Sequence, residues 1–471
     1  MTGALSSWPR GRWAVAALFA AGALLRVAAM ATFWPAWYVN PDAMGYVSAA
    51  HGALWSQVGH PVGYPLFLRI LHALSNHVAL VAVIQHGLGL ATAALLYLAA
   101  RELGANRLVA AVPAAVVLLS GDELFFEQAV LSEAPFAFLL AAMIYAASRS
   151  TRGGAGWVVA AGVALGLANS VREVALFLSP VLFGWMLWQG PPSWRRRALR
   201  TAGGAAATVA IVVAYVLAQQ HATGDGGLSR TGGWSLYART AQFADCADFT
   251  PPAGTAALCE DTPSALRPGP SFYHWNPASP AWKVFRAPPA GNAALGRFAR
   301  DAVLHQPLTY LGTVAADELR YAGLHVAAER PFGGTGPGGL VFGSGGQFRA
   351  QANAILAPVY SDVEAQTAPG SNALEAYQRV IRLHPALLGL LVLLSLSGLA
   401  SSAGRARAAV ALFGGTALVL LVVPPLVLIW AWRYGVPAHG LLAGAGAFAA
   451  AGLWRRVSAR RASTSAIPAP G

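Results

Sequence analysis

Long runs of apolar residues recur along the chain, and short polar segments separate them. A helix that spans a bilayer needs about 20 mostly apolar residues, because each residue adds only about 1.5 Å of length. The pattern therefore predicts an all-α polytopic membrane protein with about ten transmembrane helices. The ten runs lie at residues 13–33, 78–100, 108–120, 128–148, 156–171, 174–190, 201–219, 384–400, 408–429 and 436–454.

The spacing of these runs divides the chain into four parts. Residues 1–219 hold seven runs and form an N-terminal transmembrane block, and residues 384–456 hold three runs and form a C-terminal block. Between them, residues 220–383 are polar and form a large loop region, in which residues 292–323 show apolar positions at helical spacing. Residues 457–471 form a terminal tail.

Composition and charge placement support a membrane protein. Of 471 residues, 56% are hydrophobic and only 11% are charged, which is too apolar for a water-soluble surface. The net charge of +13 could suggest nucleic acid as a partner, but the arginines concentrate in every second loop. The short loops on the other side hold only Arg69, Arg172 and Arg433. This positive-inside pattern predicts cytoplasmic termini, an exoplasmic 220–383 region and no nucleic-acid partner.

Two cysteines, Cys246 and Cys259, lie thirteen positions apart in the polar region. A disulfide is the favoured interpretation, because an exported compartment permits one and closing so short a loop contributes about 3 kcal/mol. Two unpaired thiols are the alternative. The spacing does not match a CxxC metal or redox motif.

Ionisable residues gather at the predicted outer side of the membrane. Asp42 follows the first span, with Tyr46 one helical turn further on. Asp122 and Glu123 join the third and fourth spans, and Glu133 begins the fourth, where it is expected to face inward. Such groups are costly to desolvate, so the cluster is a candidate functional site. Capping of a helix is the alternative role for Asp42.

Two arginines lie in short outer turns, where the charge rule disfavours them. Arg172 lies between the fifth and sixth spans, and Arg433, followed by Tyr434, lies between the ninth and tenth. Either arginine alone is explained by a long side chain that reaches the membrane interface. Both together on the outer side favour phosphate binding.

In four motifs the sequence resembles the GT-C superfamily of glycosyltransferases that use polyprenyl-phosphate-linked sugars. This group includes protein O-mannosyltransferases and the bacterial transferase that adds aminoarabinose to lipid A. The resemblance implies a GT-C-like membrane core and does not extend to residues 220–383. The motifs that carry it are Pro41-Asp-x-x-x-Tyr46, His60-Pro-Val-Gly-Tyr-Pro65, Leu131-Ser-Glu-Ala-Pro-Phe136 and Trp432-Arg-Tyr-Gly-Val-Pro437.

The resemblance also implies residue roles. An acidic residue in the first outer loop of the family acts as catalytic base, which corresponds to Asp42 and implies inversion at the anomeric carbon. Many members have Asp-Glu at this place, whereas this chain has Asp42-Ala43. A second carboxylate would therefore have to come from Asp122, Glu123 or Glu133.

The chemistry of such a transfer fits the same residues. A sugar on a lipid phosphate already has a good leaving group, so the enzyme must deprotonate an acceptor hydroxyl and stabilise the departing phosphate. One carboxylate and one or two arginines suffice, and no cofactor is required, although a divalent metal could replace part of the arginine charge. The residues expected to position sugar or acceptor are Tyr46, His60, Tyr64 and Tyr434.

Two other classes of protein are compatible with a polytopic membrane chain. A transporter or flippase of lipid-linked sugars would place charged or broken helices near the bilayer midplane, often in repeated halves, and no convincing repeat is present. A membrane protein that binds cell-envelope glycan needs fewer spans. We therefore favour a transferase that uses a polyprenyl-phosphate-linked donor within membrane lipid. Its acceptor, a protein, a lipid or a glycan, is expected to be selected by residues 220–383.

Overall fold

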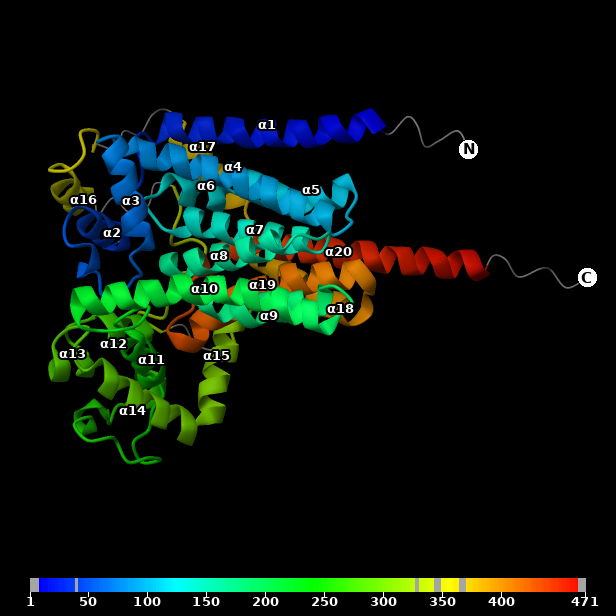
Figure 1. Ribbon diagram of the computed structural model, residues 1–471. Coiled ribbons are helices and arrows are strands. Elements are labelled where there is room, and N and C mark those ends of the chain that lie inside the picture. Colours follow the sequence, from blue (N-terminus) through cyan, green and yellow to red (C-terminus); the bar gives the residue numbers. More distant parts are fainter. Residues whose placement is uncertain (1–7, 39–40, 327–329, 343–348, 364–369, 465–471) are drawn as a thin grey trace, which may run out of the picture.

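The computed structural model describes residues 8–38, 41–326, 330–342, 349–363 and 370–464, and nearly all regular structure in them is helical. The long helices lie side by side in one bundle, with shorter helices gathered at one end and one corner (Figure 1). Within these ranges the only β interaction is an isolated bridge between Trp37 and Ala129. The predicted all-α membrane fold is confirmed.

Every expected span contains a helix. Six helices are long and apolar enough to cross a membrane by themselves, or up to seven if α5 and α6 (Gly121–Gln128), which meet at a 51° bend, form one span. Two of the other expected spans, Ala155–Val171 and Glu173–Gln189, are shorter apolar helices, so ten is an approximate count. The bundle helices are α1 (Trp8–Thr32), α4 (Ala79–Glu102), α5 (Arg107–Leu119), α7 (Glu133–Ser150), α8 (Ala155–Val171), α9 (Ser179–Gln189), α10 (Trp194–Thr223), α18 (Pro385–Ser401), α19 (Gly404–Val427) and α20 (Trp432–Thr464).

The block boundaries predicted from hydropathy move by a few residues. Helix α10 continues to Thr223, and α18 begins at Pro385. Helix α20 continues to Thr464, so the first part of the predicted tail extends this helix. Residues 465–471 lie outside the described residues.

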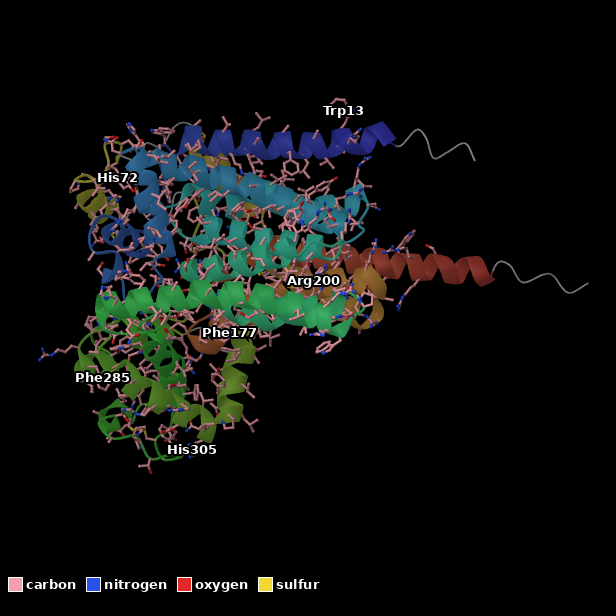
Figure 2. The ribbon with its side chains drawn as sticks, viewed as in Figure 1. Trp13, His72, Phe177, Arg200, Phe285 and His305 are labelled. Carbon is pink, nitrogen blue, oxygen red and sulfur yellow. A yellow bond between two sulfur atoms is a disulfide. The ribbon has the colours of Figure 1, made fainter. Side chains whose placement is uncertain are left out.

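The two ends of the bundle differ in what they carry. Helices α2 (Pro41–His51), α3 (Gly63–Leu74) and α16 (Arg349–Leu356) lie at one end, whereas α1 begins and α20 finishes at the other (Figure 1). Figure 2 shows the same division, with His72 and Phe285 toward the first end and Arg200 toward the second. The start of α1 and the finish of α20 therefore lie at the same end of the bundle (Figure 1).

A second group of helices at one corner of the bundle has a hydrophobic core of its own. Its buried aromatic residues include Trp234, Tyr237, Tyr273 and Phe298. The helical pattern expected over 292–323 is present, but Pro307 starts a new helix there, because proline fits the first turn of a helix better than its interior. The helices are α11 (Gly232–Ala241), α12 (Pro270–Trp275), α13 (Pro280–Phe285), α14 (Asn292–His305) and α15 (Pro307–Tyr321).

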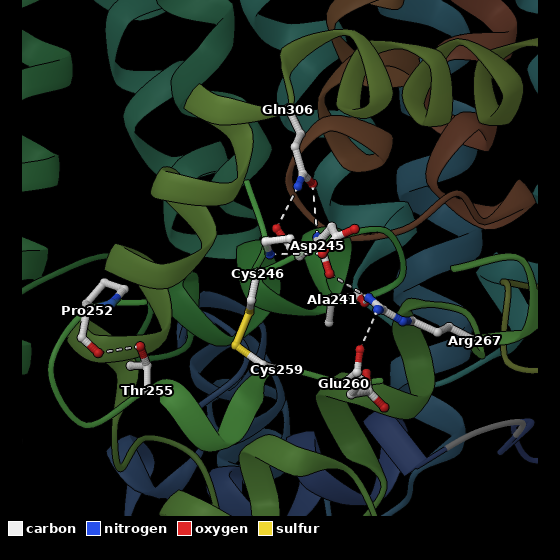
Figure 3. The surroundings of a disulfide bond; sticks show 11 residues. Ala241, Asp245, Cys246, Pro252, Thr255, Cys259, Glu260, Arg267 and Gln306 are labelled. Atoms are coloured by element: carbon white, nitrogen blue, oxygen red, sulfur yellow. Dashed lines mark hydrogen bonds between the residues drawn. A yellow bond between two sulfur atoms is a disulfide. The ribbon is translucent and has the colours of Figure 1, made fainter. Parts of the chain in front are cut away.

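The predicted disulfide between Cys246 and Cys259 is confirmed (Figure 3). Arg267 holds the surrounding loops by donating hydrogen bonds to the backbone carbonyls of Ala241 at 3.1 Å and Glu260 at 2.8 Å. The covalent link and these hydrogen bonds fix a region that contains little regular secondary structure.

Candidate active site

Helices α2 and α3 position the first carboxylate of the site. Helix α2 begins at Pro41, whose fixed φ suits the first helical turn, and Asp42 lies in that turn. Arg69 of α3 donates hydrogen bonds to the carbonyls of Ala50 at 2.7 Å and Gly52 at 2.7 Å. Ala50 lies in the last turn of α2, and Gly52 directly follows the helix. The two short helices are therefore held together as one unit.

Asp42 contacts a cation from the far end of the chain. Its Oδ2 forms an ion pair with Nη2 of Arg433, and its Oδ1 lies 3.4 Å from Nε2 of His60. Burial raises the pKa of Asp42, but the charge of Arg433 and then of His60 outweighs burial and holds the pKa well below its ordinary value. Asp42 is therefore ionised, and its side chain stays 21% exposed.

A second ion pair lies beside the first. Arg172 Nη1 is 2.7 Å from Oε1 of Glu133, whose other oxygen is buried without a hydrogen-bond partner among the described residues. The guanidinium groups of Arg172 and Arg433 lie 5.3 and 5.1 Å from the ring centroid of Tyr434. One aromatic ring thus contacts both cations, which brings them close together despite their like charge.

Tyrosines and a histidine form one wall beside the ion pairs. The ring of Tyr46 lies 5.2 Å from His60 and 4.9 Å from Tyr64, and its hydroxyl is 3.4 Å from the Ser132 hydroxyl. The Tyr64 hydroxyl donates a hydrogen bond of 2.8 Å to Gln85. Burial, and then the charge of Asp42, raises the pKa of Tyr46 well above its ordinary value. Tyr46 therefore remains a neutral hydroxyl that can donate a hydrogen bond.

Most of these groups line a cavity of about 350 Å³, but Tyr64 does not. Asp42 is not a lining residue, but it contacts two residues that are, His60 and Arg433. The cavity also has apolar walls, of which Phe177 and Val427 are exposed on the outside of the bundle. Its polar lining includes Tyr46, His60, Glu133, Arg172, Arg433 and Tyr434.

The structure does not bring Asp122 and Glu123 to this cavity. Asp122 accepts hydrogen bonds from Arg382 at 2.7 Å and from the indole of Trp432 at 3.0 Å, and Glu123 is buried in α6. A direct substrate contact for these two residues therefore has no support in this geometry. Asp122 instead holds the residue that precedes Arg433. The second carboxylate at the cavity is Glu133, with Glu173 also in the lining.

A charged network that the sequence did not predict lies inside the bundle. Glu127 of α6 forms an ion pair of 2.6 Å with Arg26 of α1 and lies 2.8 Å from Nδ1 of His86 of α4. Gln85 donates hydrogen bonds of 3.0 and 2.6 Å to the carbonyls of Glu127 and Ala129, and it also holds Tyr64. An arginine inside an apolar run was the signal available for this network.

No sequence motif indicated the cavity walls that the loop region supplies. Ser229, Thr231 and Ser235 line the cavity, and all three lie in the region where no family motif was recognised. Among the residues that the structure describes, no three His, Cys, Asp or Glu side chains are grouped as metal ligands.

Residues 70–218, roughly a third of the chain, match the family described as dolichyl-phosphate-mannose-protein mannosyltransferase. No curated protein matches the chain.

Three solved structures show a general likeness. One is the protein O-mannosyltransferase Pmt1-Pmt2 complex of S. cerevisiae bound to the sugar donor, with a TM-score of 0.38 and 20% identity over 49% of this chain and 36% of that chain. Another is the oligosaccharyltransferase AglB of Archaeoglobus fulgidus in complex with an inhibitory peptide and a dolichol-phosphate. Its TM-score is 0.45, and the identity is 12% over 98% of this chain and 52% of that chain. The third is ArnT of Cupriavidus metallidurans bound to undecaprenyl phosphate. Its TM-score is 0.37, and the identity is 14% over 97% of this chain and 79% of that chain.

This chain thus spans only about a third of the Pmt chain and about half of AglB. All three TM-scores are below 0.5, so these likenesses carry no information about activity. The family match includes Glu133 of α7 and Arg172, which directly follows α8, and it begins six residues after Tyr64. The predicted resemblance to glycosyltransferases that use polyprenyl-phosphate-linked sugars is confirmed, and the mannosyltransferase family is the one whose pattern residues 70–218 match.

Proposed function

We propose that this protein is a membrane glycosyltransferase that moves a sugar from a polyprenyl-phosphate donor to an acceptor hydroxyl on the exoplasmic side. The observation that carries the proposal is the Asp42–Arg433 pair beside a cavity that also holds Arg172. A base beside a pocket that holds two phosphate-binding cations is what this reaction needs. The family match of residues 70–218 supports the same reaction class.

In the proposed step, the acceptor oxygen attacks the anomeric carbon while the bond from that carbon to the phosphate oxygen breaks. Asp42 accepts the proton of the acceptor hydroxyl, and polyprenyl phosphate leaves with the bonding electron pair. A single displacement of this kind inverts the anomeric carbon. Arg433 and Arg172 stabilise the negative charge that develops on the departing phosphate.

The ion pair in the free protein gives Arg433 two successive roles. While it contacts Asp42, the carboxylate is ionised but weakly basic, because the guanidinium favours the charged form. An incoming phosphate competes for the same guanidinium. When Arg433 turns to the phosphate, Asp42 loses part of this stabilisation and becomes a stronger base. Donor binding therefore activates the base.

The other residues of the cavity orient the reactants. Glu133 holds Arg172 at 2.7 Å, and Tyr434 contacts both guanidinium groups. Tyr46 and His60 present a hydroxyl and an imidazole at the wall nearest Asp42, where they can hydrogen-bond a sugar or acceptor. The proposed chemistry uses side chains of the protein itself, so removal of divalent metal with a chelator should leave the rate unchanged.

The surroundings of the cavity suit a lipid-linked donor. Phe177 and Val427 line the cavity and are also exposed on apolar helices, which provides an apolar path for a polyprenyl chain. The positions of the arginines favour an exoplasmic location for this end of the bundle. Both features support a donor that enters sideways from the membrane.

A flippase would need charged groups near the middle of the membrane. The buried Arg26–Glu127 pair is charged, but Arg26 lies only six residues before the end of α1, which is about 9 Å from its outer end. The ion pairs of Asp42 and Glu133 also lie at that end. The distribution of charge therefore favours chemistry at one face over passage through the bilayer.

Replacement of the proposed base tests the function. In the variant Asp42→Asn, transfer of radiolabelled sugar from a panel of polyprenyl-phosphate sugars should fall by about 10²–10⁴-fold, because the carboxylate no longer accepts the proton. Asp225→Asn is the matched control, since Asp225 is an exposed carboxylate outside the cavity. Full activity of Asp42→Asn, with normal membrane insertion, would remove the proposed mechanism.

Replacement of Arg433 tests the proposed binding of the donor phosphate. Arg433→Ala should raise the KM for the donor by roughly 10–100-fold, because a hydrogen bond to a charged group contributes about 1.5–3 kcal/mol. Donor and acceptor concentrations are varied separately in steady-state assays. An unchanged donor KM together with a raised acceptor KM would show that Arg433 does not bind the phosphate.

A further inference from the structure

Helix α15 carries a row of exposed leucines that the proposed chemistry does not use. Leu308 is 82% exposed, Leu311 55% and Leu319 37%. Together with Ala315, which is also exposed, they recur every three or four positions and form one face of the helix, here called the leucine stripe. Leucines that water contacts along a whole helix are costly, so this face is expected to have a partner.

Charge is sparse around the leucine stripe. Residues 302–316 contain no Asp, Glu, Lys or Arg, although the water-exposed face of a helix usually carries such residues. The acidic residue directly before Leu319 is Glu318. Burial, and then the charge of Asp317, raises the pKa of Glu318 to about 8, so this carboxyl group stays largely protonated at neutral pH. The surroundings of the stripe therefore suit an apolar partner.

Two other faces of α15 have partners within the protein. On the face toward the bundle, the Tyr310 hydroxyl donates a hydrogen bond of 2.9 Å to the carbonyl of Leu426, and the Tyr321 hydroxyl donates one of 3.1 Å to that of Ala431. With about 3.6 residues per turn, the leucine stripe lies on neither this face nor the next. The next face lines a second cavity, of about 320 Å³, inside the corner group of helices, through Thr309, Gly312 and Thr313.

The end of α15 contacts a membrane span. A Cβ atom at Gly389 of α18 would lie 2.7 Å from the Cβ atom of Ala322, and one at Gly323 would lie 3.2 Å from that of Pro385, the first residue of α18. Ala322 lies three positions after Leu319 and so continues the leucine stripe. Helix α18 itself is apolar and has exposed leucines that face lipid, namely Leu387, Leu390, Leu393 and Leu396.

The direction of α15 fits a helix that lies along a membrane surface. It runs across the direction of the bundle helices, whereas α18 runs with them (Figure 1). From its contact with Ala322, α18 crosses the membrane toward the end of the bundle that holds the free ends of α1 and α20. Because Ala322 and the leucine stripe share one side of α15, that side faces the membrane. The stripe therefore continues the lipid-contacting surface of α18 at the rim of the bilayer.

We propose that α15 is an interfacial helix whose leucine stripe lies among the acyl chains of the bilayer leaflet nearer the first cavity. Helices of this kind lie in the plane of the membrane, with their apolar face roughly 5–10 Å deep. The inference goes beyond sugar transfer, because it stands on the exposure and spacing of the stripe and on its contact with α18.

The lipid contact has a consequence for the first cavity. Helix α15 binds the carbonyls of Leu426 and Ala431, and between them Val427 and Leu428 line that cavity. A membrane surface that holds α15 would therefore also fix one wall of the first cavity, together with the corner group of helices that α15 belongs to.

Spin labels on α15 test the proposal. The chain has no cysteines besides the disulfide pair Cys246–Cys259, so a nitroxide reagent labels an introduced cysteine alone. The variants Leu308→Cys and Leu311→Cys place a label on the leucine stripe. Thr309→Cys is the matched control, because Thr309 is an exposed neighbour on the face of the second cavity. Full-length protein is placed in nanodiscs of phosphatidylcholine and phosphatidylglycerol.

Power-saturation EPR measures the accessibility of each label to oxygen, which concentrates among acyl chains, and to a nickel chelate, which stays in water. Both labels on the stripe should be more accessible to oxygen, at a depth of roughly 5–10 Å, whereas the control label should be more accessible to the chelate. Adding Leu308→Glu should shift the Leu311→Cys label toward the chelate, because a carboxylate is costly to bury. Adding Thr309→Glu to the same labelled variant should cause no shift.

Two results would overturn the proposal. Higher accessibility to the chelate than to oxygen for both labels on the stripe would place the leucine stripe in water. Low accessibility of both labels to both reagents would show that protein, such as a second copy of this chain, covers it. Because no sugar transfer is measured, the outcome is independent of the Asp42→Asn assay.

Discussion

Charged side chains around the first cavity are held in pairs, and each pair sets what its members can do. Asp42 is ionised because Arg433 and His60 lie beside it, and Arg172 is held by Glu133. Removal of one member of a buried pair leaves an uncompensated charge, which costs about 3–5 kcal/mol. Substitutions here must therefore be checked for folding as well as for activity.

Glu318 gives a prediction at the same scale. The unfolded carboxyl group loses its proton near pH 4.3, whereas the folded one loses it near pH 8. Between these values the folded state binds more protons than the unfolded state, so this group lowers stability progressively as the pH rises from about 5 to 8. Glu318→Gln removes the effect. The variant should gain in apparent melting temperature over the parent, with a gain that is larger at pH 8 than at pH 5.

Glu375→Gln is the matched control, because Glu375 forms an exposed pair with Arg379 and has a more accessible carboxylate. Its difference in melting temperature from the parent should change little between pH 5 and pH 8. A gain for Glu318→Gln that is the same at both pH values would contradict the raised pKa.

At the scale of elements, helices α1, α4 and α6 are joined by the Arg26–Glu127–His86 network. Helix α4 can approach Glu127 because it has a glycine at position 89, where a Cβ atom would lie 1.8 Å from Oε1 of Glu127. The same helix presents Gly87 on an exposed face, where a Cβ atom meets nothing within 4 Å. Two glycines on one helix therefore have different roles.

Replacement of each glycine by alanine separates these roles. Gly89→Ala should lower the free energy of unfolding by roughly 1–3 kcal/mol, because the added methyl group forces the buried carboxylate away from its partners. Gly87→Ala should be neutral or slightly stabilising, since alanine favours helix. Thermal unfolding in detergent measures both. Equal melting temperatures for the two variants would show that the close contact at Gly89 is unimportant.

At the scale of the whole molecule, the helix that starts the chain and the helix that finishes it have their free ends at the same end of the bundle (Figure 1). Glu102 forms ion pairs with Arg149 at 3.1 Å and Arg152 at 2.7 Å in the loops predicted to be cytoplasmic. The corner helices and the first cavity belong to the elements predicted to be exoplasmic. The arrangement therefore gives each face of the membrane a distinct set of exposed residues.

Cysteine labelling tests this orientation. A membrane-impermeant thiol reagent should label Ser264→Cys in intact cells, because Ser264 is exposed in the corner group of helices. Thr151→Cys, exposed between α7 and α8, should react only after the membrane is permeabilised. The two native cysteines form a disulfide and do not interfere. Labelling of Thr151→Cys alone in intact cells would reverse the proposed orientation.

The sequence by itself determined the helices and their order. Apolar runs located every bundle helix, because a membrane span must be both long and apolar wherever it occurs, but α10 begins seven residues before its run and α20 ends ten residues after its run. Local signals also indicated a helical turn between Asp42 and Tyr46, and they predicted the Cys246–Cys259 disulfide, which depends on two residues close in sequence.

Only the tertiary structure decided which charges meet. Asp42 and Arg433 are 391 positions apart, and no local pattern distinguishes this pairing from one between Asp42 and Arg172. Asp122, a candidate for the cavity on sequence grounds, instead contacts Arg382 and Trp432. The physical reason is that hydropathy reports how each helix meets lipid, whereas ion pairs depend on the rotation and packing of helices against one another.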